Sequence, residues 1–340
     1  MKKFLFLSLF PLFAFSGNLN ELLNLAEQNK QVEASRYSLE ASKEKEYATK
    51  SAYMPNLTLG ATQTFNQESN MFAAEKDTTG TATLAFTIYD GGKREASFEQ
   101  QQALVKSATF ALASVQNNIS NTLEYLTGEQ VSIEKGSTIA YKEVINNEEN
   151  KRLDILALEE SVQSNKSEIK MAKAPNLPTI ALQNTYSKHD FDYPVATENL
   201  KEQNSVQLSM QWKIFDFAST SSNAQAAYLN YLSKNSELSY AKYKAKASFK
   251  NAQNSYKTSL AKIEAAKAKL QASEMTYELV KKKFQQGIVN NVSYLDALSD
   301  KFNSNSQLQT ALNEVEYQKA VLLYEMGENI KGAIQWKRFL

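Results

Sequence analysis

Residues 245–287 read AKASFKNAQNSYKTSLAKIEAAKAKLQASEMTYELVKKKFQQG. Apolar and small side chains recur in this stretch at alternating steps of four and three residues: Ala245, Phe249, Ala252, Tyr256, Ser259, Ile263, Ala266, Leu270, Ser273, Tyr277, Val280 and Phe284. This spacing is typical of a helix that supercoils left-handedly against a neighbour. The pattern predicts one long helix from about Ser219 to Gln286, roughly 100 Å in length at ~1.5 Å per residue.

Gly287 begins a break in this helix, because the next residues read GIVNNV. A second amphipathic run follows and continues to about Gly327, with apolar residues at Leu295, Leu298, Phe302, Leu308, Leu312, Val315 and Leu322. A glycine between two helical patterns is a common helix terminator. We therefore expect a hairpin of two antiparallel helices over about 219–327.

The first residues have the pattern of a secretory signal peptide. Two lysines precede an apolar run over residues 4–15, and Ala14 and Ser16 stand at the positions that a signal peptidase reads. We expect cleavage after about Ser16 and export from the cytoplasm. No later segment approaches the ~20 apolar residues of a membrane helix. The chain contains no cysteine, which excludes disulfides, thiolate metal sites and a lipid-modified cysteine.

Composition indicates a mostly helical fold. The chain has 42% hydrophobic residues but only 10 Gly and 5 Pro, and long tracts are rich in Ala, Ser, Asn, Gln, Glu and Lys. Its 38 basic and 37 acidic residues give a formal charge of +1 and are spread along the chain. This balance argues against a nucleic-acid partner.

Four stretches alternate between apolar and polar residues and predict β-strands over about 56–66, 80–89, 178–187 and 204–215. The last is the most regular, with Val206, Leu208, Met210, Trp212 and Ile214 separated by polar residues. Pro55 and Pro178 precede the first and third strands. The fold class that we expect is mostly α with a four-stranded antiparallel β contribution.

The order of elements occurs twice, and this repeat organises the whole mature chain. Residues 17–128 form a first unit of helix, strand pair and helices, and residues 129–340 form a second. The second strand closes with Ile88-Tyr89-Asp90 and the fourth with Ile214-Phe215-Asp216. The units end alike, at Tyr125-Leu126-Thr127-Gly128 and Tyr324-Glu325-Met326-Gly327.

Strands with one apolar and one polar face suit an outer-membrane barrel, with the apolar face toward lipid and the polar face toward a wet lumen. An open sheet in lipid would leave backbone groups unpaired, at several kcal/mol each. Four strands must therefore close with strands of other chains, which predicts an oligomer. Four aromatic residues near the strand ends suit an interfacial girdle, although aromatic residues also simply favour strands: Tyr89, Tyr186, Trp212 and Phe215.

The duplicated pattern resembles the TolC family of outer-membrane efflux channels over nearly the whole mature chain. The motifs that carry the resemblance are the prolines before the strands, the closures at Asp90-Gly91-Gly92 and Asp216, Phe284-Gln285-Gln286-Gly287, Tyr294-Leu295-Asp296-Ala297, and Tyr324 to Gly327. The resemblance implies a homotrimer with a twelve-stranded barrel in outer-membrane lipid and a helical tube in the periplasm. It also implies a periplasmic adaptor, an inner-membrane transporter and export of drugs or other solutes.

The first half departs from the family pattern. Asp90 and Gly128 are 38 positions apart, whereas Asp216 and Gly327 are 111 apart, so most of the first long hairpin is missing. Either the remaining hairpins rearrange or the pore is unsealed; alternatively, the chain is a shortened homologue that no longer conducts. The rival class is a periplasmic coiled-coil interaction protein, such as an adaptor-like rod with a small soluble sheet.

The resemblance also assigns candidate site residues. Asp296 aligns with an acidic residue at the periplasmic channel entrance, and Ser293 stands where the family has a second acid. The turn Gly287, Ile288, Val289, Asn290 and Asn291 is the expected adaptor-contact tip. Both assignments have a plainer alternative. Asp296 could simply be an exposed carboxylate near the start of a helix, and the turn could simply be a loop that breaks the helix.

The chain's one histidine, His189, lies beside Asp190 and Asp192 in what we expect to be a loop facing outside the cell. A lone histidine with two acids could hold a metal, but such loops are usually only solvated, so we predict no metal site. We find no catalytic group of residues and no phosphate-binding loop. The sequence thus predicts neither an enzyme nor a cofactor.

Overall fold

The computed structural model describes residues 29–65, 76–127, 137–139, 152–191, 202–327 and 334–336. The chain divides into two units: Met1–Ser35, Leu112–Ile155 and Ala241–Leu340 form the first, and Arg36–Ala111 and Leu156–Tyr240 the second. The predicted signal peptide lies outside the described residues. None of the described helices combines the length and the apolarity that crossing a membrane requires.

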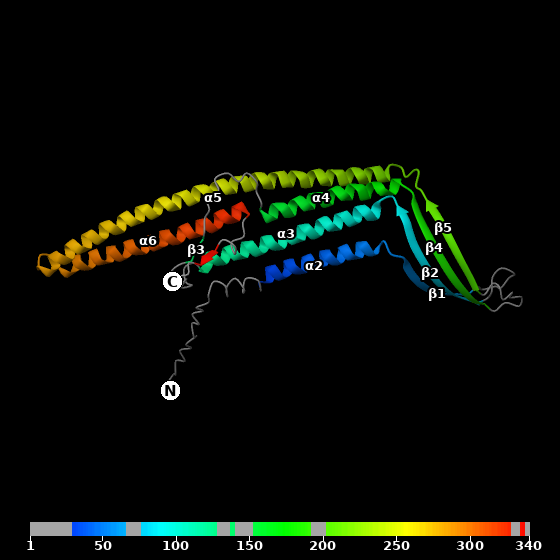
Figure 1. Cartoon of the computed structure of the whole chain (residues 1–340), viewed down its shortest axis with the longest axis horizontal. Coiled ribbons are helices and arrows are strands. Elements are labelled where there is room, and N and C mark those ends of the chain that lie inside the picture. The colour runs from blue at the N-terminus through cyan, green and yellow to red at the C-terminus, as the bar shows by residue number, and fades with distance from the viewer. Residues whose placement is uncertain are drawn as a thin grey trace, which may run out of the picture. The chain divides into compact units, whose positions relative to one another are not determined.

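The second unit contains a four-stranded antiparallel sheet (Figure 1). Its strands lie side by side in the order β1 (Asn56–Phe65), β2 (Lys76–Asp90), β4 (Thr179–Phe191) and β5 (Glu202–Gln211). β1 and β2 come from the first half of the chain and β4 and β5 from the second, and the two halves join where β2 pairs with β4. The four strands predicted from alternation are confirmed.

The strand bounds differ from the prediction in one informative place. Alternation continues to Ile214, but β5 ends at Gln211, so the prediction of a strand to about 215 was wrong. Trp212 leaves the ladder, and its indole Nε1 donates a hydrogen bond to the carbonyl oxygen of Asn176, at 3.0 Å. At the opposite end, β2 and β4 continue beyond the predicted bounds, to Lys76 and Phe191.

The register places side chains of one kind opposite one another. Leu57 pairs with Leu84, and Leu182 pairs with Phe86 on one side and Leu208 on the other. On the opposite face a row of hydroxyl side chains crosses all four strands: Thr58, Thr83, Thr185 and Ser205. Every residue of β1 and β5 is exposed, including those on the apolar face. The described residues of the chain therefore leave that face uncovered.

Helices of the second unit pack through polar contacts between α3 (Lys93–Thr127) and α4 (Leu153–Lys173). Lys170 Nζ lies 2.6 Å from Glu99 Oε2, and Ser107 Oγ donates to the carbonyl oxygen of Ala157 at 2.8 Å. α2 (Lys30–Ser51) ends before Pro55. A short 3-10 turn, η1 (Ala174–Asn176), leads from α4 into β4.

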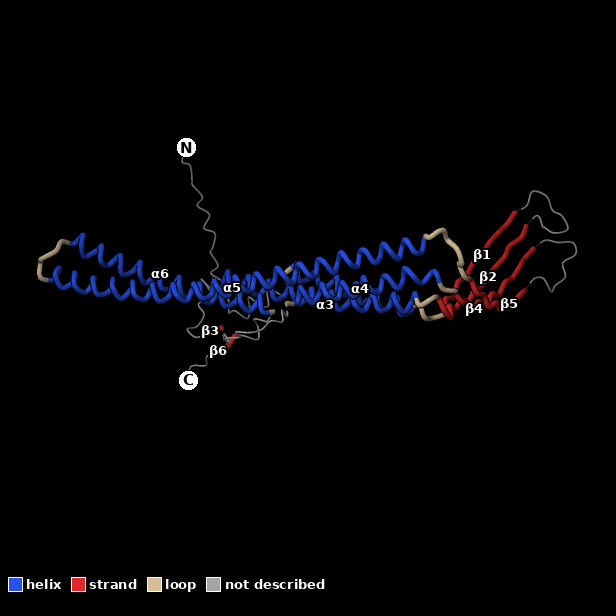
Figure 2. Tube along the Cα trace, turned by 90° about the horizontal axis from the view of Figure 1, so that it is seen from above, coloured by secondary structure: helices blue, strands red, loops and turns tan. Residues whose placement is uncertain are grey.

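The long hairpin consists of α5 (Ser219–Gln285) and α6 (Asn291–Met326), which a turn connects within the first unit (Figure 2). The predicted α5 seam is confirmed: every seam residue from Ala245 to Val280 is buried or half-buried. Where the hairpin ends, Ala252, Leu322 and Met326 form a buried cluster against Phe249 and Tyr256. Gly327 then terminates α6 in the left-handed conformation, at φ 78°.

Two further contacts of the first unit lie near this end. The strand β6 (Ile334–Trp336), near the end of the chain, pairs antiparallel with β3 (Ser137–Ile139). Arg152 binds Asp154 through two nitrogens, at 3.0 and 2.7 Å, and Glu325 at 2.5 Å. Its guanidinium lies 5.2 Å from the Tyr324 ring centre. These contacts join the residues before α4 to the last turn of α6.

Candidate functional site

The predicted adaptor-contact tip is a tightly hydrogen-bonded turn. Gly287 adopts φ +69°, and the amide of Ile288 donates to the carbonyl oxygen of Lys283 at 2.8 Å. The amide of Gly287 donates to Phe284 at 2.9 Å. This pair of bonds is the Schellman motif, which ends a helix by satisfying its last carbonyl groups. The break that the sequence predicts at Gly287 is therefore a defined cap.

Asn290 starts the returning helix. Its side chain accepts a hydrogen bond from the amide of Ser293 at 2.9 Å, and the Ser293 hydroxyl donates to the same oxygen at 3.0 Å. Asn291 is the first residue of α6, and Val289 is half-buried. Ile288 remains 65% exposed at the apex of the turn. The tip thus presents an apolar side chain on a rigid turn.

Asp296 and Ser293, the residues predicted for the channel entrance, lie one turn apart on α6 and therefore on neighbouring parts of one face. Asp296 is exposed, whereas the Ser293 hydroxyl is occupied by the cap. A ring of charge at this level would thus depend on Asp296, with Ser293 serving the fold of the tip.

An aromatic cluster above the tip was not anticipated. The phenol oxygens of Tyr277 and Tyr294 are 3.2 Å apart, and the ring of Phe284 stacks on Tyr294 with centroids 5.0 Å apart. Lys301 lies 5.0 Å from the centre of the Tyr277 ring. The hydrogen bond with Tyr277 raises the pKa of Tyr294 above its usual value. Tyr277 and Phe284 stood in the predicted α5 seam, but nothing in the sequence pattern singled out Tyr294 as their partner.

The side of α6 that faces α5 agrees with the predicted apolar run at Leu308, Val315 and Leu322 and differs from it nearer the tip. Leu295, Phe302 and Leu312, three members of the predicted apolar run, are 51%, 61% and 38% exposed. The less exposed residues at heptad spacing are instead Tyr294, Ala297, Lys301, Ser304, Leu308, Ala311, Val315 and Leu322. Near the tip, small and amphipathic side chains therefore face α5, and Leu295 and Phe302 point away from it.

The two corners where a strand passes into a helix are built alike. Asp90 accepts a hydrogen bond from the amide of Arg94 at 3.2 Å, and Asp216 accepts one from the amide of Thr220 at 2.9 Å. Both carboxylates therefore cap the helix that follows. The next two residues at each corner have positive φ: Gly91 at 71°, Gly92 at 79°, Phe217 at 52° and Ala218 at 66°.

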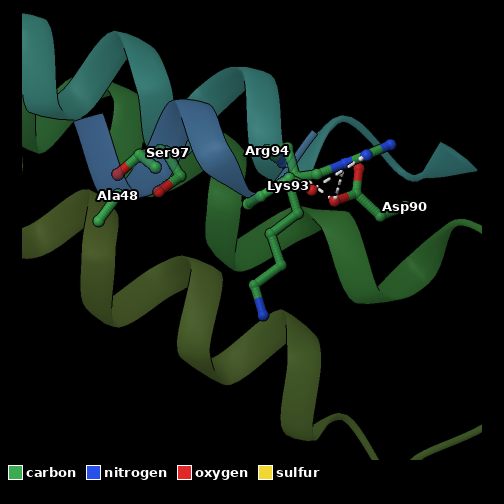
Figure 3. Close-up of a pocket in the computed structure, with 7 residues that line it drawn as sticks. Ala48, Asp90, Lys93, Arg94 and Ser97 are labelled. Carbon is green, nitrogen blue, oxygen red and sulfur yellow. Dashed lines mark hydrogen bonds and ion pairs between the residues drawn. The ribbon is translucent and has the colours of Figure 1, made fainter. Parts of the chain in front are cut away.

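A pocket of about 450 Å³ lies beside the first corner, lined by residues of α2, α3 and the segments next to them (Figure 3). Asp90 Oδ2 lies 3.1 Å from Arg94 Nε, whereas its Oδ1 is buried and has no hydrogen-bond partner among the described residues. The Lys93 side chain points away from this pair. Because Arg94 already neutralises the carboxylate, the pocket supplies a structural ion pair and no acid–base pair.

His189 lies in β4 and not in the loop predicted for it. Its Nδ1 is 2.9 Å from the Thr79 hydroxyl and 3.9 Å from Asp77 Oδ1, on the polar face of the sheet. Cross-strand pairing with β2 extends the strand through these polar residues. The prediction of a loop was therefore wrong. No group of metal-binding side chains occurs in the parts of the chain that the structure describes.

Residues 144–326, more than half of the chain, match the family described as outer membrane efflux protein. The chain belongs to the outer membrane efflux protein family. This membership confirms the TolC-like resemblance, and the family is one of outer-membrane efflux channels and not of enzymes. Among curated protein sequences, none matches the chain.

Solved structures of outer-membrane proteins, two of them described as outer-membrane channels, share the fold. VceC from Vibrio cholerae is 13% identical with a TM-score of 0.74, over 92% of this chain and 96% of that one. CmeC from Campylobacter jejuni is 14% identical with a TM-score of 0.73, over 94% and 87%. MtrE from Neisseria gonorrhoeae is 13% identical with a TM-score of 0.71, over 92% and 89%. At these identities the likeness establishes the fold alone.

Proposed function

We propose that three copies of this chain form the outer-membrane channel of a tripartite export system. Their sheets close a twelve-stranded barrel in outer-membrane lipid, and their helices extend into the periplasm. A periplasmic adaptor and an inner-membrane transporter deliver drugs or other solutes to this channel. Family membership and the shared fold support the proposal.

The two faces of the sheet carry the proposal. Leu59, Leu208 and Met210 are 75%, 67% and 63% exposed on a face that the described chain leaves uncovered. Apolar side chains gathered on one sheet face need lipid or protein against them. Threonine, serine and glutamine on the opposite face suit a water-filled lumen.

The outer edges of the sheet require other copies. β1 and β5 each pair with one neighbour only, so a row of backbone groups on each is free in the described chain. Lipid offers these groups no hydrogen bonds. Pairing β1 of one copy with β5 of the next satisfies both rows and closes the barrel. The exposed Trp212 and Phe215 follow β5 directly, where an interfacial girdle would stand.

We assign the entrance of the channel to the periplasmic end of the α5–α6 hairpin. Three copies of Asp296 in a narrow passage would favour cations over anions. The turn from Gly287 to Asn291, with Ile288 exposed, would contact the adaptor. This assignment rests on the family resemblance and on the rigid caps at both sides of the turn.

Single-channel recording of detergent-purified protein in a planar bilayer tests this function. We expect heat-sensitive trimers in the outer-membrane fraction and a cation-preferring conductance that Asp296→Ala makes less selective. Glu278→Ala, which removes an exposed carboxylate at the same height from the opposite face of the hairpin, serves as a control. Trimers without conductance would indicate a non-conducting homologue, and a soluble periplasmic monomer would indicate the coiled-coil alternative.

A further inference from the structure

The α5–α6 hairpin has a second seam of apolar and small residues on each helix, on the side away from its partner. On α5 the outer seam is Ala261, Ala265, Ala268, Ala272, Met275 and Leu279, and all six residues are exposed. On α6 it is Val292, Leu295, Ser299, Phe302 and Ser306, also exposed. Both sets follow the alternating steps of three and four residues that a helix packing partner requires.

The outer seams are displaced from the inner ones by a constant two residues. Ser273 and Tyr277 face α6, and Met275 and Leu279 follow each by two positions. Two residues correspond to roughly 200° around a helix of 3.6 residues per turn, so they lie on its opposite side. On α6 the displacement is again two residues, in the reverse direction. The hairpin is thus a flat pair of helices with an edge of apolar and small residues along each side.

Contacts inside the hairpin fix which residues stand at the same height. Glu274 pairs with Lys301 at 3.9 Å, and Lys269 Nζ lies 2.8 Å from Gln307. By this register Leu279 is level with Leu295 on the opposite edge, and Ala272 is level with Phe302. Phe302, the largest side chain of one edge, thus stands at the height of an alanine on the other.

We infer that the α5 edge of one copy packs against the α6 edge of the next copy, so that three hairpins form a closed ring of six helices. Copies related by rotation keep their residues level, which places Phe302 of one copy against Ala272 of the next and Leu279 against Leu295. The two edges differ, and an interface between unlike surfaces generates a ring when the rotation closes. This inference rests on the proposed trimeric channel.

The shortened first half makes this arrangement specific to the present chain. Residues 128–152, between α3 and α4, are too few to form a second hairpin as long as α5–α6. The first half therefore supplies no wall between neighbouring long hairpins. With helix axes about 9 Å apart, a ring of six places each axis about 9 Å from the centre and leaves a narrow passage. Direct contacts between the three hairpins would thus close the wall around this passage.

The absence of cysteine from the chain permits a direct test. The variant Leu279→Cys with Leu295→Cys is purified in detergent as the full chain, treated with an oxidant or a short bismaleimide, and run on a denaturing gel without reductant. We expect most of the monomer to move into covalent dimers and trimers. Each single variant should stay monomeric on the gel. The control pair Glu278→Cys with Asp300→Cys, at similar height but off both edges, should also stay monomeric.

Each other outcome overturns the inference in a distinguishable way. A heat-sensitive trimer with conductance but no crosslink at Leu279 and Leu295 would leave the channel standing and assign the edges to a different partner. Dimers from Leu279→Cys alone would show like edges meeting. A protein that never forms an oligomer would overturn the proposed function as well.

A second variant tests the same packing without cysteine, in case the double-cysteine protein does not fold. Ala268→Glu places a charge in the α5 edge and should lower the temperature at which the trimer dissociates. Gln271→Glu adds the same charge to an exposed residue outside either seam and should leave that temperature unchanged. Equal effects of the two substitutions would contradict edge-to-edge packing.

Discussion

Gly91 lies directly against Ala174: a Cβ atom added to Gly91 would stand 2.5 Å from the carbonyl oxygen of Ala174. It would also stand 2.9 Å from the Cβ atom of Leu177. Gly92 has a similar φ, but a Cβ atom there would meet nothing within 4 Å. Alanine at Gly92 therefore tests only the energetic cost of a positive φ, whereas alanine at Gly91 also tests the cost of a steric clash with Ala174.

We expect Gly92→Ala to destabilise the protein by about 1 kcal/mol, the usual cost of a left-handed non-glycine residue. Gly91→Ala should cost roughly 1–3 kcal/mol more, because backbone at η1 must move. Thermal unfolding of both variants, followed by circular dichroism in detergent, measures the difference. Equal losses would show that η1 can move away at little cost.

At the second corner, Phe217 and Ala218 hold positive φ values of 52° and 66° without being glycine. Such residues are strained by roughly 1–2 kcal/mol each. Ala218→Gly relieves this strain and loses only a methyl group, although glycine gains freedom in the unfolded chain. We expect a net stabilisation of up to about 1 kcal/mol in the same unfolding assay. A destabilised variant would indicate that the alanine methyl group is needed for packing.

Asp216 makes the stability of this corner depend on pH. The Thr220 hydroxyl, and then its amide, donate hydrogen bonds that lower the pKa of Asp216 below its usual value. A lowered folded-state pKa stabilises the protein above the unfolded-state pKa, and this stability is lost as the pH falls through the folded-state pKa. Asp216→Asn should therefore reduce the melting temperature at neutral pH but not in acid. A deficit that is constant with pH would show that the charge contributes nothing.

Arg152 tests a largely buried ion pair against an exposed one. The side chains of Arg152 and Glu325 are only 15% and 13% exposed, whereas those of Lys170 and Glu99 are 56% and 46% exposed. Arg152→Ala leaves Glu325 without its cation and should cost about 3 kcal/mol. Lys170→Ala should cost less than about 1 kcal/mol. Chemical denaturation of both variants distinguishes them, and similar losses would contradict the structural role of Arg152.

Local sequence patterns predicted the helices and strands because each pattern favours one type of secondary structure in its own residues. Alternation in Val206, Leu208 and Met210 predicts a strand with one apolar face, and the heptads from Ala245 to Phe284 predict a packed helix. Pairing between elements is not local. β4 continues through His189 because β2 lies beside it, which has no signal in the residues themselves. β5 ends at Gln211, opposite Thr179, and the next residue on the β4 side is Pro178, which has no amide hydrogen to donate.

The tip shows the same limit. Gly287 and Asn290 are recognisable caps, so the turn could be placed from sequence. The inner face of α6 could be placed only in part: Val315 and Leu322 lie on it as predicted, but near the tip hydrophobicity wrongly assigned large apolar residues to the nearest partner. A helix with two seams breaks that rule: Ser304 is 2% exposed toward α5, while Phe302 is 61% exposed. Which seam faces which helix depends on the volume available between them.

Two adjacent residues of β5 test the membrane barrel against a soluble sheet. Leu208 pairs with Leu182 on the apolar face, and Ser209 pairs with Ala181 on the opposite face. Both residues are exposed in the single chain, so a soluble sheet would tolerate arginine at either position. In a barrel, arginine on the lipid face costs roughly 2–4 kcal/mol near the membrane centre, whereas the lumen accepts it. We expect Leu208→Arg to abolish trimers in the outer-membrane fraction and Ser209→Arg to preserve them with altered ion selectivity. Survival of both variants as soluble protein would support the periplasmic alternative.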